Sequence, residues 1–287
     1  MTVPLPLDPE QRDWLRERLP DAVLVRDMSW RLMASTVLRV RSGGADYVVK
    51  AGGPENHHIG REIAAHPRRT AALTSSGHAA RMLDADPDLR VMLLEHLPGV
   101  LVEGTPAEWR PDTYVQAGDL LRRLHAQETR EDPDHERIAT DRALGWLDQP
   151  HRVDPDAERA ARRILERAET PSVRVVPAHG DWQPRNWLIS PDAEAGDGVI
   201  RVIDFGRFAF RPANSDLGRL AGQQWRGRPD LERAFFDGYG EDPRDPVLWP
   251  LHLLREAVGT ACWAFKVGDT AFEQQGHRLL SEALARF

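Results

Sequence analysis

Cysteine is almost absent from this sequence of 287 residues, and its scarcity excludes two common kinds of stabilising site. The only cysteine is Cys262. A single thiol cannot form an intrachain disulfide or supply the cysteine cluster of a structural metal site. No activating pattern surrounds Cys262, so we expect a buried, unreactive thiol in a helix rather than a nucleophile.

Long apolar runs are also missing. No stretch approaches the roughly 18 consecutive apolar residues that a membrane-crossing helix needs. The first residues lack the basic segment followed by an apolar run that marks a secretory signal. The sequence therefore predicts a cytoplasmic protein without a membrane partner.

Positive charge is in deficit, and lysine above all is rare. The formal net charge is −7, which argues against a nucleic-acid partner, because phosphate backbones bind basic surfaces. This charge favours cationic or neutral small substrates. Only Lys50 and Lys266 are lysines among the 38 basic residues, and the other 36 are arginines. The two cations bind phosphates differently, so Lys50 is a candidate for a site that needs a compact ammonium group.

Apolar patterning divides the chain into a strand-rich first part and a helical second part. Two β-rich runs, 36–40 and 47–50, flank a turn at 42–44 and predict a hairpin that ends at Lys50. In the second part, apolar residues at three- and four-residue spacing predict helices near 112–127, 155–169, 215–225, 229–239 and 247–267, and one more at the end of the chain. Short strands are expected in VRVVPAH, NWLI and GVIRVID, with a hairpin loop at 193–198.

Two short apolar stretches of the second part contain carboxylates. HGDWQPRNWLI holds Asp181 and Asn186, and VIDFG holds Asp204. An ionised group in an apolar stretch is costly unless it has a partner or a function. Carboxylate and amide oxygens suit Mg²⁺, and phosphoryl transfer also needs a carboxylate that orients a hydroxyl. We expect Gly206 to provide the sharp turn that lets the Asp204 carboxylate face a cleft.

The order H-x-D-x-x-x-x-N, an apolar hairpin and D-F-G resembles the catalytic order of the protein-kinase-like fold. Several features resemble the aminoglycoside phosphotransferase and choline kinase-like family within it: H-G-D in the loop, LLRRLH at 120–125, the spacing of Pro212, Asp216 and Leu217, and the lack of an activation segment. The resemblance extends from about residue 20 to the end of the chain. It implies a two-lobed α+β fold, with a small β-rich nucleotide-binding lobe (1–94), a hinge (95–99) and a larger helical lobe (100–287).

The resemblance also implies roles for individual residues. Asp181 would be the catalytic base, Asn186 and Asp204 would bind Mg²⁺, and Lys50 would contact the α and β phosphates of ATP or GTP. Glu62, twelve residues after Lys50, would pair with that lysine, although Glu55 is an alternative.

The nucleotide would have further contacts in the first lobe. Backbone groups around Glu95 and Leu97 would bind the base. The segment 27–44 lacks a G-x-G-x-x-G pattern, so by resemblance to the antibiotic kinases Ser35 and Thr36 would contact the phosphates instead.

Other prominent side chains near these motifs have structural interpretations. We expect His179 to bond backbone groups near the loop. Trp182 and Trp187 should pack in the interior, with Trp182 the better candidate for lining a substrate pocket. The histidines at 57, 58, 66 and 78 fit no usual metal-ligand spacing and are expected to be solvated.

Together, the motifs imply a small-molecule kinase that transfers the γ-phosphoryl group of ATP or GTP to a hydroxyl of an antibiotic, an aminoglycoside or a related compound. Alternatives are a metabolic kinase for choline, a sugar or an amino alcohol, and a nucleotide-binding regulatory protein without transfer. The chain would act as a monomer or a dimer. Acidic residues that could bind a cationic acceptor are Asp237, Glu241, Asp242, Glu256 and the terminal carboxylate of Phe287.

Overall fold

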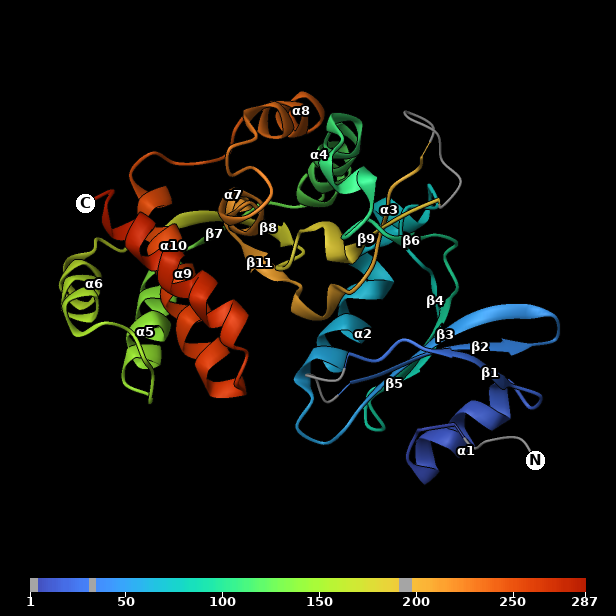
Figure 1. Cartoon of the computed structure of the whole chain (residues 1–287). Coiled ribbons are helices and arrows are strands. Elements are labelled where there is room, and N and C mark those ends of the chain that lie inside the picture. Colours follow the sequence, from blue (N-terminus) through green and yellow to red (C-terminus); the bar gives the residue numbers. More distant parts are fainter. Residues whose placement is uncertain (1–4, 31–34, 191–197) are drawn as a thin grey trace. The chain divides into compact units, whose positions relative to one another are not determined.

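The computed structural model describes residues 5–30, 35–190 and 198–287 of the chain (Figure 1). Contacts divide the chain into two compact units. Unit 1 consists of Met1–Gln127, His179–Ala209 and Arg233–Gly240, and unit 2 consists of Glu128–Ala178, Phe210–Glu232 and Glu241–Phe287. The lobe boundaries at 94 and 99 stay a prediction, because these units follow contacts and not the order of the chain. The predicted loop at 193–198 lies outside the described residues except for Gly198.

A five-stranded antiparallel sheet organises unit 1. The strands are β1 (Val23–Asp27), β2 (Ser35–Ser42), β3 (Ala45–Gly52), β4 (Met82–Asp86) and β5 (Val91–Glu95), in the order β1-β2-β3-β5-β4. β2 pairs with β3 from Ser35 opposite Gly52 to Ser42 opposite Ala45. The predicted hairpin that leads to Lys50 is therefore confirmed.

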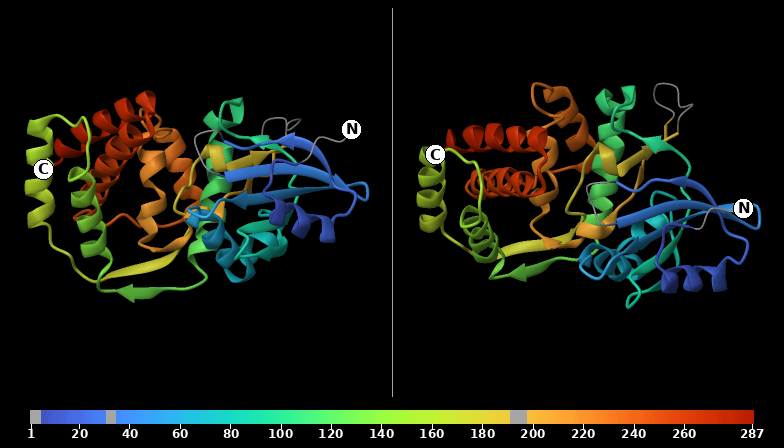
Figure 2. Two further views of the ribbon diagram at one scale, coloured as in Figure 1. Left: turned by 90° about the horizontal axis from the view of Figure 1, so that it is seen from below. Right: turned by 60° about the horizontal axis from the view of Figure 1, so that its bottom comes forward.

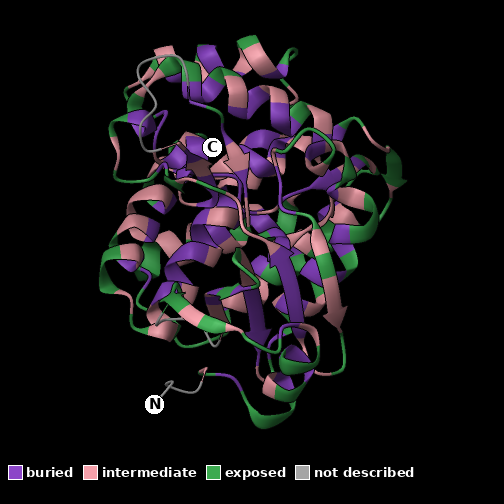
Figure 3. Cartoon of the chain, turned by 90° about the vertical axis from the view of Figure 1, so that its right-hand side faces the viewer, coloured by how far each residue is buried: buried purple, intermediate pink, exposed green. Residues whose placement is uncertain are grey.

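Two helices cover the two faces of this sheet: α1 (Pro9–Arg18) and α2 (His57–Arg69). Side chains alternate between the faces of a strand. Trp14 of α1 packs on the face that carries Val49, and Ile59 of α2 packs on the face that carries Met92. Buried residues follow the central strands (Figure 3). Because Lys50 directly follows Val49, its side chain lies on the α2 face.

The rest of unit 1 holds a second sheet and a close pair of helices. The sheet has the order β10-β9-β6 and contains β6 (Val100–Leu101), β9 (Trp187–Ile189) and β10 (Arg201–Val202). The other elements are α3 (Ala71–Thr74), η1 (Pro106–Trp109), α4 (Pro111–His125), η2 (Pro184–Asn186), η3 (Phe205–Arg207) and the end of α8 (Pro229–Tyr239). A Cβ atom at Gly118 of α4 would lie 2.1 Å from the Phe235 carbonyl oxygen of α8, so this crossing requires glycine.

Unit 2 is mostly helical. Its elements are β7 (Arg130–Asp132), α5 (His135–Leu147), α6 (Pro155–Arg167), β8 (Val173–Ala178), β11 (Ala209–Arg211), η4 (Ala213–Asp216), α7 (Gly218–Gly222), α9 (Leu248–Val267) and α10 (Thr270–Leu284). α9 and α10 lie side by side (Figure 2). Their core includes Leu254, Val258 and Leu280. None of the helices within the described ranges is long and apolar enough to cross a membrane.

Cys262 lies in this helical core and is 1% exposed. Burial raises the pKa of its thiol to about 11, so the thiolate is scarce at neutral pH. The buried position in a helix predicted from the sequence is confirmed.

Candidate active site

Lys50 forms a buried ion pair with α2. Its Nζ atom donates to both carboxylate oxygens of Glu62, each at 2.8 Å. Glu62 is 2% exposed, whereas Glu55 is exposed, so the structure pairs Lys50 with the first of the two candidate glutamates. Burial alone lowers the pKa of Lys50 and raises that of Glu62. The charges of Asp204 and Glu62 instead raise the pKa of Lys50, and Lys50 lowers the pKa of Glu62. Both groups therefore stay charged.

Asp204 extends this pair toward solvent. Its Oδ1 atom lies 3.4 Å from Lys50 Nζ, and its side chain is 51% exposed. The backbone of Asp204 has φ 67°, in the left-handed region, whereas Gly206 has no positive φ. The sharp turn is therefore at Asp204, and its prediction at Gly206 was wrong. Aspartate adopts this conformation more readily than most residues, because its short polar side chain bonds locally.

Gly206 instead leaves room beside the carboxylate. A Cβ atom there would lie 3.3 Å from Asp204 Oδ1 and 3.3 Å from His58 Cβ. His58 Nδ1 lies 3.0 Å from the Gly206 carbonyl oxygen. The glycine thus permits the first turn of α2, which holds His58, to approach the D-F-G segment.

Phe205 anchors that segment in the interior. It is 1% exposed, and its ring contacts those of His66 and His179, with centroids 5.7 Å and 4.9 Å away. Its N–H donates to Glu62 Oε1 at 3.3 Å. The glutamate that pairs with Lys50 therefore also holds the backbone next to Asp204.

The prediction of solvated histidines was wrong for three of the four. His58 contacts Gly206, His66 is 7% exposed, and His78 Nδ1 lies 2.7 Å from the Ile200 carbonyl oxygen. His66 is buried, and His58 and His78 contact backbone carbonyls of distant segments, which spacing along the chain does not reveal.

His179 connects the loop that holds Asp181 to Ile203, the residue before Asp204. Its Nε2 atom lies 3.0 Å from the Ile203 carbonyl oxygen, and its Nδ1 atom accepts the Asp181 N–H at 3.3 Å. A neutral ring with its proton on Nε2 satisfies both contacts. The predicted backbone contacts of His179 are thus confirmed. Gly180 has φ 81°, and a Cβ atom there would lie 2.4 Å from the Arg207 carbonyl oxygen, so the loop needs glycine at this position.

The Asp181 carboxylate is 4% exposed and is surrounded by donors. Its Oδ1 atom accepts from Gln183 Nε2 at 2.5 Å. Its Oδ2 atom accepts from Arg185 Nη2 at 2.7 Å and Asn186 Nδ2 at 3.2 Å. Arg207 Nε lies 4.0 Å from Oδ2. These three donors hold the Asp181 carboxylate in one orientation.

Asn186 brings an amide oxygen to the same region. Its Nδ2 atom donates to the Asp181 carbonyl oxygen at 2.8 Å, so Oδ1 is the atom suited to a cation. The Ile203 N–H donates to the Asn186 carbonyl oxygen at 3.0 Å, which places Asn186 beside the residue before Asp204.

These oxygens fit Mg²⁺, which usually takes one or two carboxylates and completes its shell with water and substrate phosphates. Among the described residues, no group of three or more His, Cys, Asp or Glu side chains could hold a metal.

The remaining predicted contacts lie at the ends of strands. Glu95 ends β5, and its N–H donates to the Arg81 carbonyl oxygen at 3.0 Å. Leu97 packs beside the α2 face of the sheet. Ser35 and Thr36 begin β2, and Ser35 Oγ accepts from Asn56 Nδ2 at 2.7 Å. Their contacts with a nucleotide stay predictions. The neighbouring residues 31–34 lie outside the described part of the chain.

The two tryptophans of the loop pack in the interior as predicted. Trp182 and Trp187 are both 0% exposed, and their ring centroids are 5.7 Å apart. The suggestion that Trp182 lines a pocket was therefore wrong, because its ring is enclosed by the loop itself. Arg185 was not predicted as a partner of Asp181. Its position four residues after the carboxylate was the signal that could have identified it.

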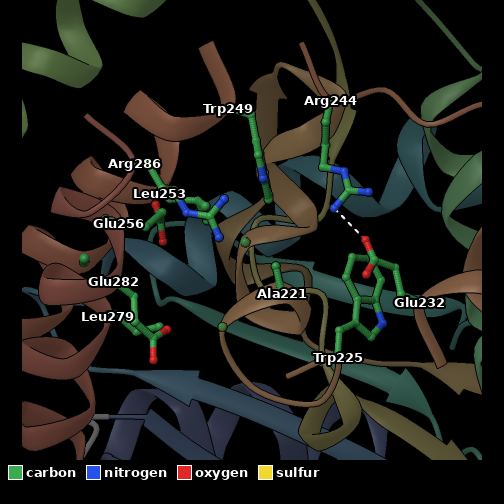
Figure 4. A pocket seen from close by; sticks show the side chains of 14 residues that line it. Ala221, Trp225, Glu232, Arg244, Trp249, Leu253, Glu256, Leu279, Glu282 and Arg286 are labelled. Atoms are coloured by element: carbon green, nitrogen blue, oxygen red, sulfur yellow. Dashed lines mark ion pairs between the residues drawn. The ribbon is translucent and has the colours of Figure 1, made fainter. Parts of the chain in front are cut away.

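Unit 2 contains a cavity of about 200 Å³ lined by α7, α9 and α10. Arg244 spans one side, where it pairs with Glu232 at 2.7 Å and lies over the ring of Trp249 at 5.6 Å (Figure 4). Glu256, one of the acidic candidates named from the sequence, lines this cavity. Asp242, another candidate, is bound to Arg244.

Comparison with known families and structures places this geometry in context. A family model described as the phosphotransferase enzyme family matches residues 19–249. A search of curated proteins finds no match.

Solved structures share the fold. A choline kinase from Streptococcus pneumoniae matches with a TM-score of 0.69 and 12% identity, over 97% of this chain and 100% of that one. A thermostable mutant of an aminoglycoside phosphotransferase, in ternary complex with ADP and hygromycin B, matches with 0.65 and 15%, over 95% and 97%. The GDP complex of an aminoglycoside 2′-phosphotransferase matches with 0.67 and 13%, over 96% and 98%. The predicted two-lobed protein-kinase-like fold is confirmed.

Proposed function

Because the chain belongs to the phosphotransferase enzyme family, we propose that it transfers the γ-phosphoryl group of ATP or GTP to a hydroxyl of an antibiotic, an aminoglycoside or a related compound. As a member of this family it is a small-molecule kinase whose acceptor is an alcohol group. The observation that carries the proposal is the cluster of Lys50, Glu62 and Asp204 in the same unit as the loop of Asp181 and Asn186. The cytoplasmic location predicted from the sequence is part of this proposal.

Lys50 would hold the α and β phosphates. Its ammonium group is fixed by Glu62 at 2.8 Å and keeps its charge. A compact cation in a fixed position suits phosphate oxygens that approach from the solvent side. The nucleotide is ATP or GTP in this proposal, since the solved structures of similar fold hold ADP in one case and GDP in another.

Asn186 and Asp204 would hold Mg²⁺. When bound, the ion neutralises charge that develops on the phosphoryl oxygens. The protein contributes the Oδ1 oxygen of Asn186 and the half-exposed carboxylate of Asp204. The contact of Asp204 with Lys50 orients that carboxylate.

Asp181 would orient the attacking hydroxyl and accept its proton. Three side-chain donors fix the carboxylate in the orientation from which it would act on the hydroxyl. Fixing the carboxylate before the reaction reduces the entropy cost of reaching the transition state.

The choice of acceptor rests on charge and on the shared fold. The net charge of −7 favours a cationic compound, which includes aminoglycosides. The fold shared with a choline kinase favours choline or another amino alcohol as the second candidate.

The experiment is phosphoryl transfer from MgATP or MgGTP to a panel of aminoglycosides, other antibiotics, choline and sugars, followed by mass spectrometry. We expect one class of acceptor to gain a phosphoryl group. Asp181→Asn should reduce this transfer by about 10³-fold or more, with the nucleotide dissociation constant within about twofold of wild type.

The matched control is Asp84→Asn. Asp84 also pairs with an arginine, Arg18, but is far along the chain from the loop. It should retain full transfer. Equal losses in the two variants, or transfer by Asp181→Asn at the wild-type rate, would contradict the assigned base. Nucleotide binding without transfer to any acceptor would favour a regulatory protein.

A further inference from the structure

Arg185 is a cation in direct contact with the carboxylate that we assign as base. Its Nη2 atom lies 2.7 Å from Asp181 Oδ2, and its side chain is 32% exposed. The guanidinium carbon also lies 5.5 Å from the ring centroid of Trp30. Burial raises the pKa of Glu103, and the charge of Arg185 counteracts this rise. The guanidinium group therefore lies near a second acid, in a strongly charged part of unit 1.

Simple distances place the transferred phosphoryl group close to this cation. A hydroxyl that hydrogen-bonds to the base lies about 2.6–3.2 Å from it. A reactive hydroxyl oxygen lies about 3–3.5 Å from the phosphorus. The phosphorus is thus within roughly 7 Å of the Asp181 carboxylate, by the sum of these two distances. Arg185 is bound to the same carboxylate through Nη2, and its remaining N–H donors are therefore within reach of the phosphoryl oxygens.

Trp30 fixes the direction from which Arg185 approaches. The preceding residue, Ser29, is bound to β2, because its hydroxyl accepts the Val37 N–H at 3.0 Å. Its own N–H donates to Asp27 Oδ1 at 2.9 Å. Trp30 is therefore held at the start of the segment between β1 and β2, although it is 47% exposed. An aromatic face beside a guanidinium plane limits its rotation and leaves its edge donors for an anion.

A second arginine of unit 1 also contacts an aspartate and a tryptophan, but its aspartate is not part of the proposed reaction site. Arg18 pairs with Asp84 at 2.5 Å and lies over Trp14 at 4.0 Å, and its side chain is 29% exposed. Asp84 is 46% exposed, whereas Asp181 is 5% exposed as a side chain. An arginine on a solvated acid needs no further explanation. An arginine bound to a buried carboxylate at the centre of a proposed reaction site does need an explanation. Arg18 serves as the matched control for Arg185.

We propose that Arg185 is a further catalytic residue, which binds the γ-phosphoryl group of the nucleotide and stabilises it during transfer, with Trp30 as its positioning residue. The inference rests on the proposed function. In the step itself, the hydroxyl oxygen forms a bond to the γ-phosphorus, and the bond from that phosphorus to the β–γ bridging oxygen breaks. The hydroxyl proton passes to Asp181, and the nucleoside diphosphate leaves with the electron pair of the broken bond. Arg185 spreads the charge of the transferred oxygens through paired N–H donors.

The test compares nucleotides with and without the γ-phosphoryl group. Calorimetry measures the dissociation constants of MgADP and Mg-AMP-PNP for wild type, Arg185→Ala and the control Arg18→Ala. We expect wild type and Arg18→Ala to prefer Mg-AMP-PNP to the same degree. Arg185→Ala should lose about tenfold of that preference, with an unchanged dissociation constant for MgADP. Trp30→Ala should lose part of it, and Trp30→Phe less.

Turnover gives a second readout on the same variants. We expect hydrolysis of MgATP to fall about 100-fold in Arg185→Ala, as for other donors removed from a transition state, and to stay unchanged in Arg18→Ala. Arg185→Lys should retain more turnover than Arg185→Gln, because it keeps a positive charge.

The outcomes separate this inference from the function on which it rests. A wild-type protein that binds neither nucleotide overturns the proposed function and this inference with it. A wild-type preference that is absent, or that survives undiminished in Arg185→Ala, overturns this inference alone. If Arg185→Ala also fails to bind MgADP, Arg185→Lys and Arg185→Gln are compared instead. An equal preference for Mg-AMP-PNP over MgADP in these two variants overturns the assignment of Arg185.

Discussion

Each unit of the molecule contains a buried ion pair, and the two pairs have different surroundings. In unit 1, Lys50 and Glu62 have side chains 11% and 2% exposed. In unit 2, Arg255 and Glu136 are 7% and 6% exposed, with a separation of 2.5 Å. Lys50 of the first pair also contacts Asp204, an acid that is half exposed. Arg255 of the second pair also donates to the Thr140 hydroxyl at 2.6 Å.

This difference indicates which kind of ion pair marks a reaction site. The unit 2 pair has balanced charge and is closed by a neutral hydroxyl, so little of its charge can act on a ligand. The unit 1 cluster has two acids for one lysine, and one of those acids reaches solvent. A buried ion pair by itself is weak evidence for either stability or function. The additional, partly exposed carboxylate of Asp204 distinguishes the site of unit 1.

The largest effect should come from breaking the pair of unit 2. Arg255→Met leaves the Glu136 carboxylate buried without its partner, which typically costs about 3–5 kcal/mol of stability. Urea unfolding followed by circular dichroism measures this loss. Arg255→Met combined with Glu136→Leu should recover most of it, because no charge is then left unpaired. A loss below about 1 kcal/mol for the single variant would show that water reaches this pair.

Breaking the pair of unit 1 should also act on activity. Lys50→Met removes the cation assigned to the phosphates, and we expect turnover of MgATP to fall by about 10²–10³-fold. Steady-state kinetics measure this effect, with the double variant of Arg255 and Glu136 as the control that keeps full turnover. Similar activity losses in both pairs would erase the distinction between the units.

A swap of cations sharpens the comparison further. Lys50→Arg keeps the charge but replaces the compact ammonium by a planar fork, so we expect about a 10²-fold loss of turnover. Arg255→Lys keeps the ion pair with Glu136 and loses the second donor to Thr140, so it should cost about 1 kcal/mol and no activity. Full turnover in Lys50→Arg would mean that only the sign of the charge matters at this position.

The smallest predicted effect is a dependence of stability on pH. Although burial opposes it, Lys50 lowers the pKa of Glu62 below its ordinary value. A carboxyl group with a lower pKa in the folded state stabilises the protein above its unfolded pKa, and this contribution disappears as the pH falls toward the folded pKa. The stability difference between wild type and Glu62→Gln should therefore shrink by on the order of 1–2 kcal/mol between pH 6 and pH 3. A constant difference over this range would show that Glu62 titrates normally.

The sequence allowed much of this arrangement to be predicted because the relevant spacings are local. Asp181, Asn186 and Asp204 stand in one ordered pattern, and Lys50 lies at the end of a clear hairpin. These residues led to the family and the fold, both of which are confirmed. The pairing of Lys50 with Glu62 rather than Glu55 needed the structure, because both glutamates lie near the start of α2.

Other features depend on three-dimensional contacts that spacing does not encode. The sharp turn was predicted at Gly206, because glycine is the usual residue for such turns. The left-handed backbone is instead that of Asp204. α5 was not predicted, and Ile138 explains why. This apolar side chain is 46% exposed and interrupts the periodicity of the helix. The acceptor could not be deduced, because its recognition depends on surface residues whose positions along the chain carry no pattern.

The near absence of lysine has a practical consequence for chemical labelling. Amine-directed reagents need an uncharged, accessible amine. Lys50 is buried and protonated through its contacts with Glu62 and Asp204, whereas Lys266 is exposed. Among lysine side chains, such reagents should therefore modify Lys266 first. This residue at the end of α9 offers an attachment point for a dye or a surface, outside the segments that carry the proposed reaction site.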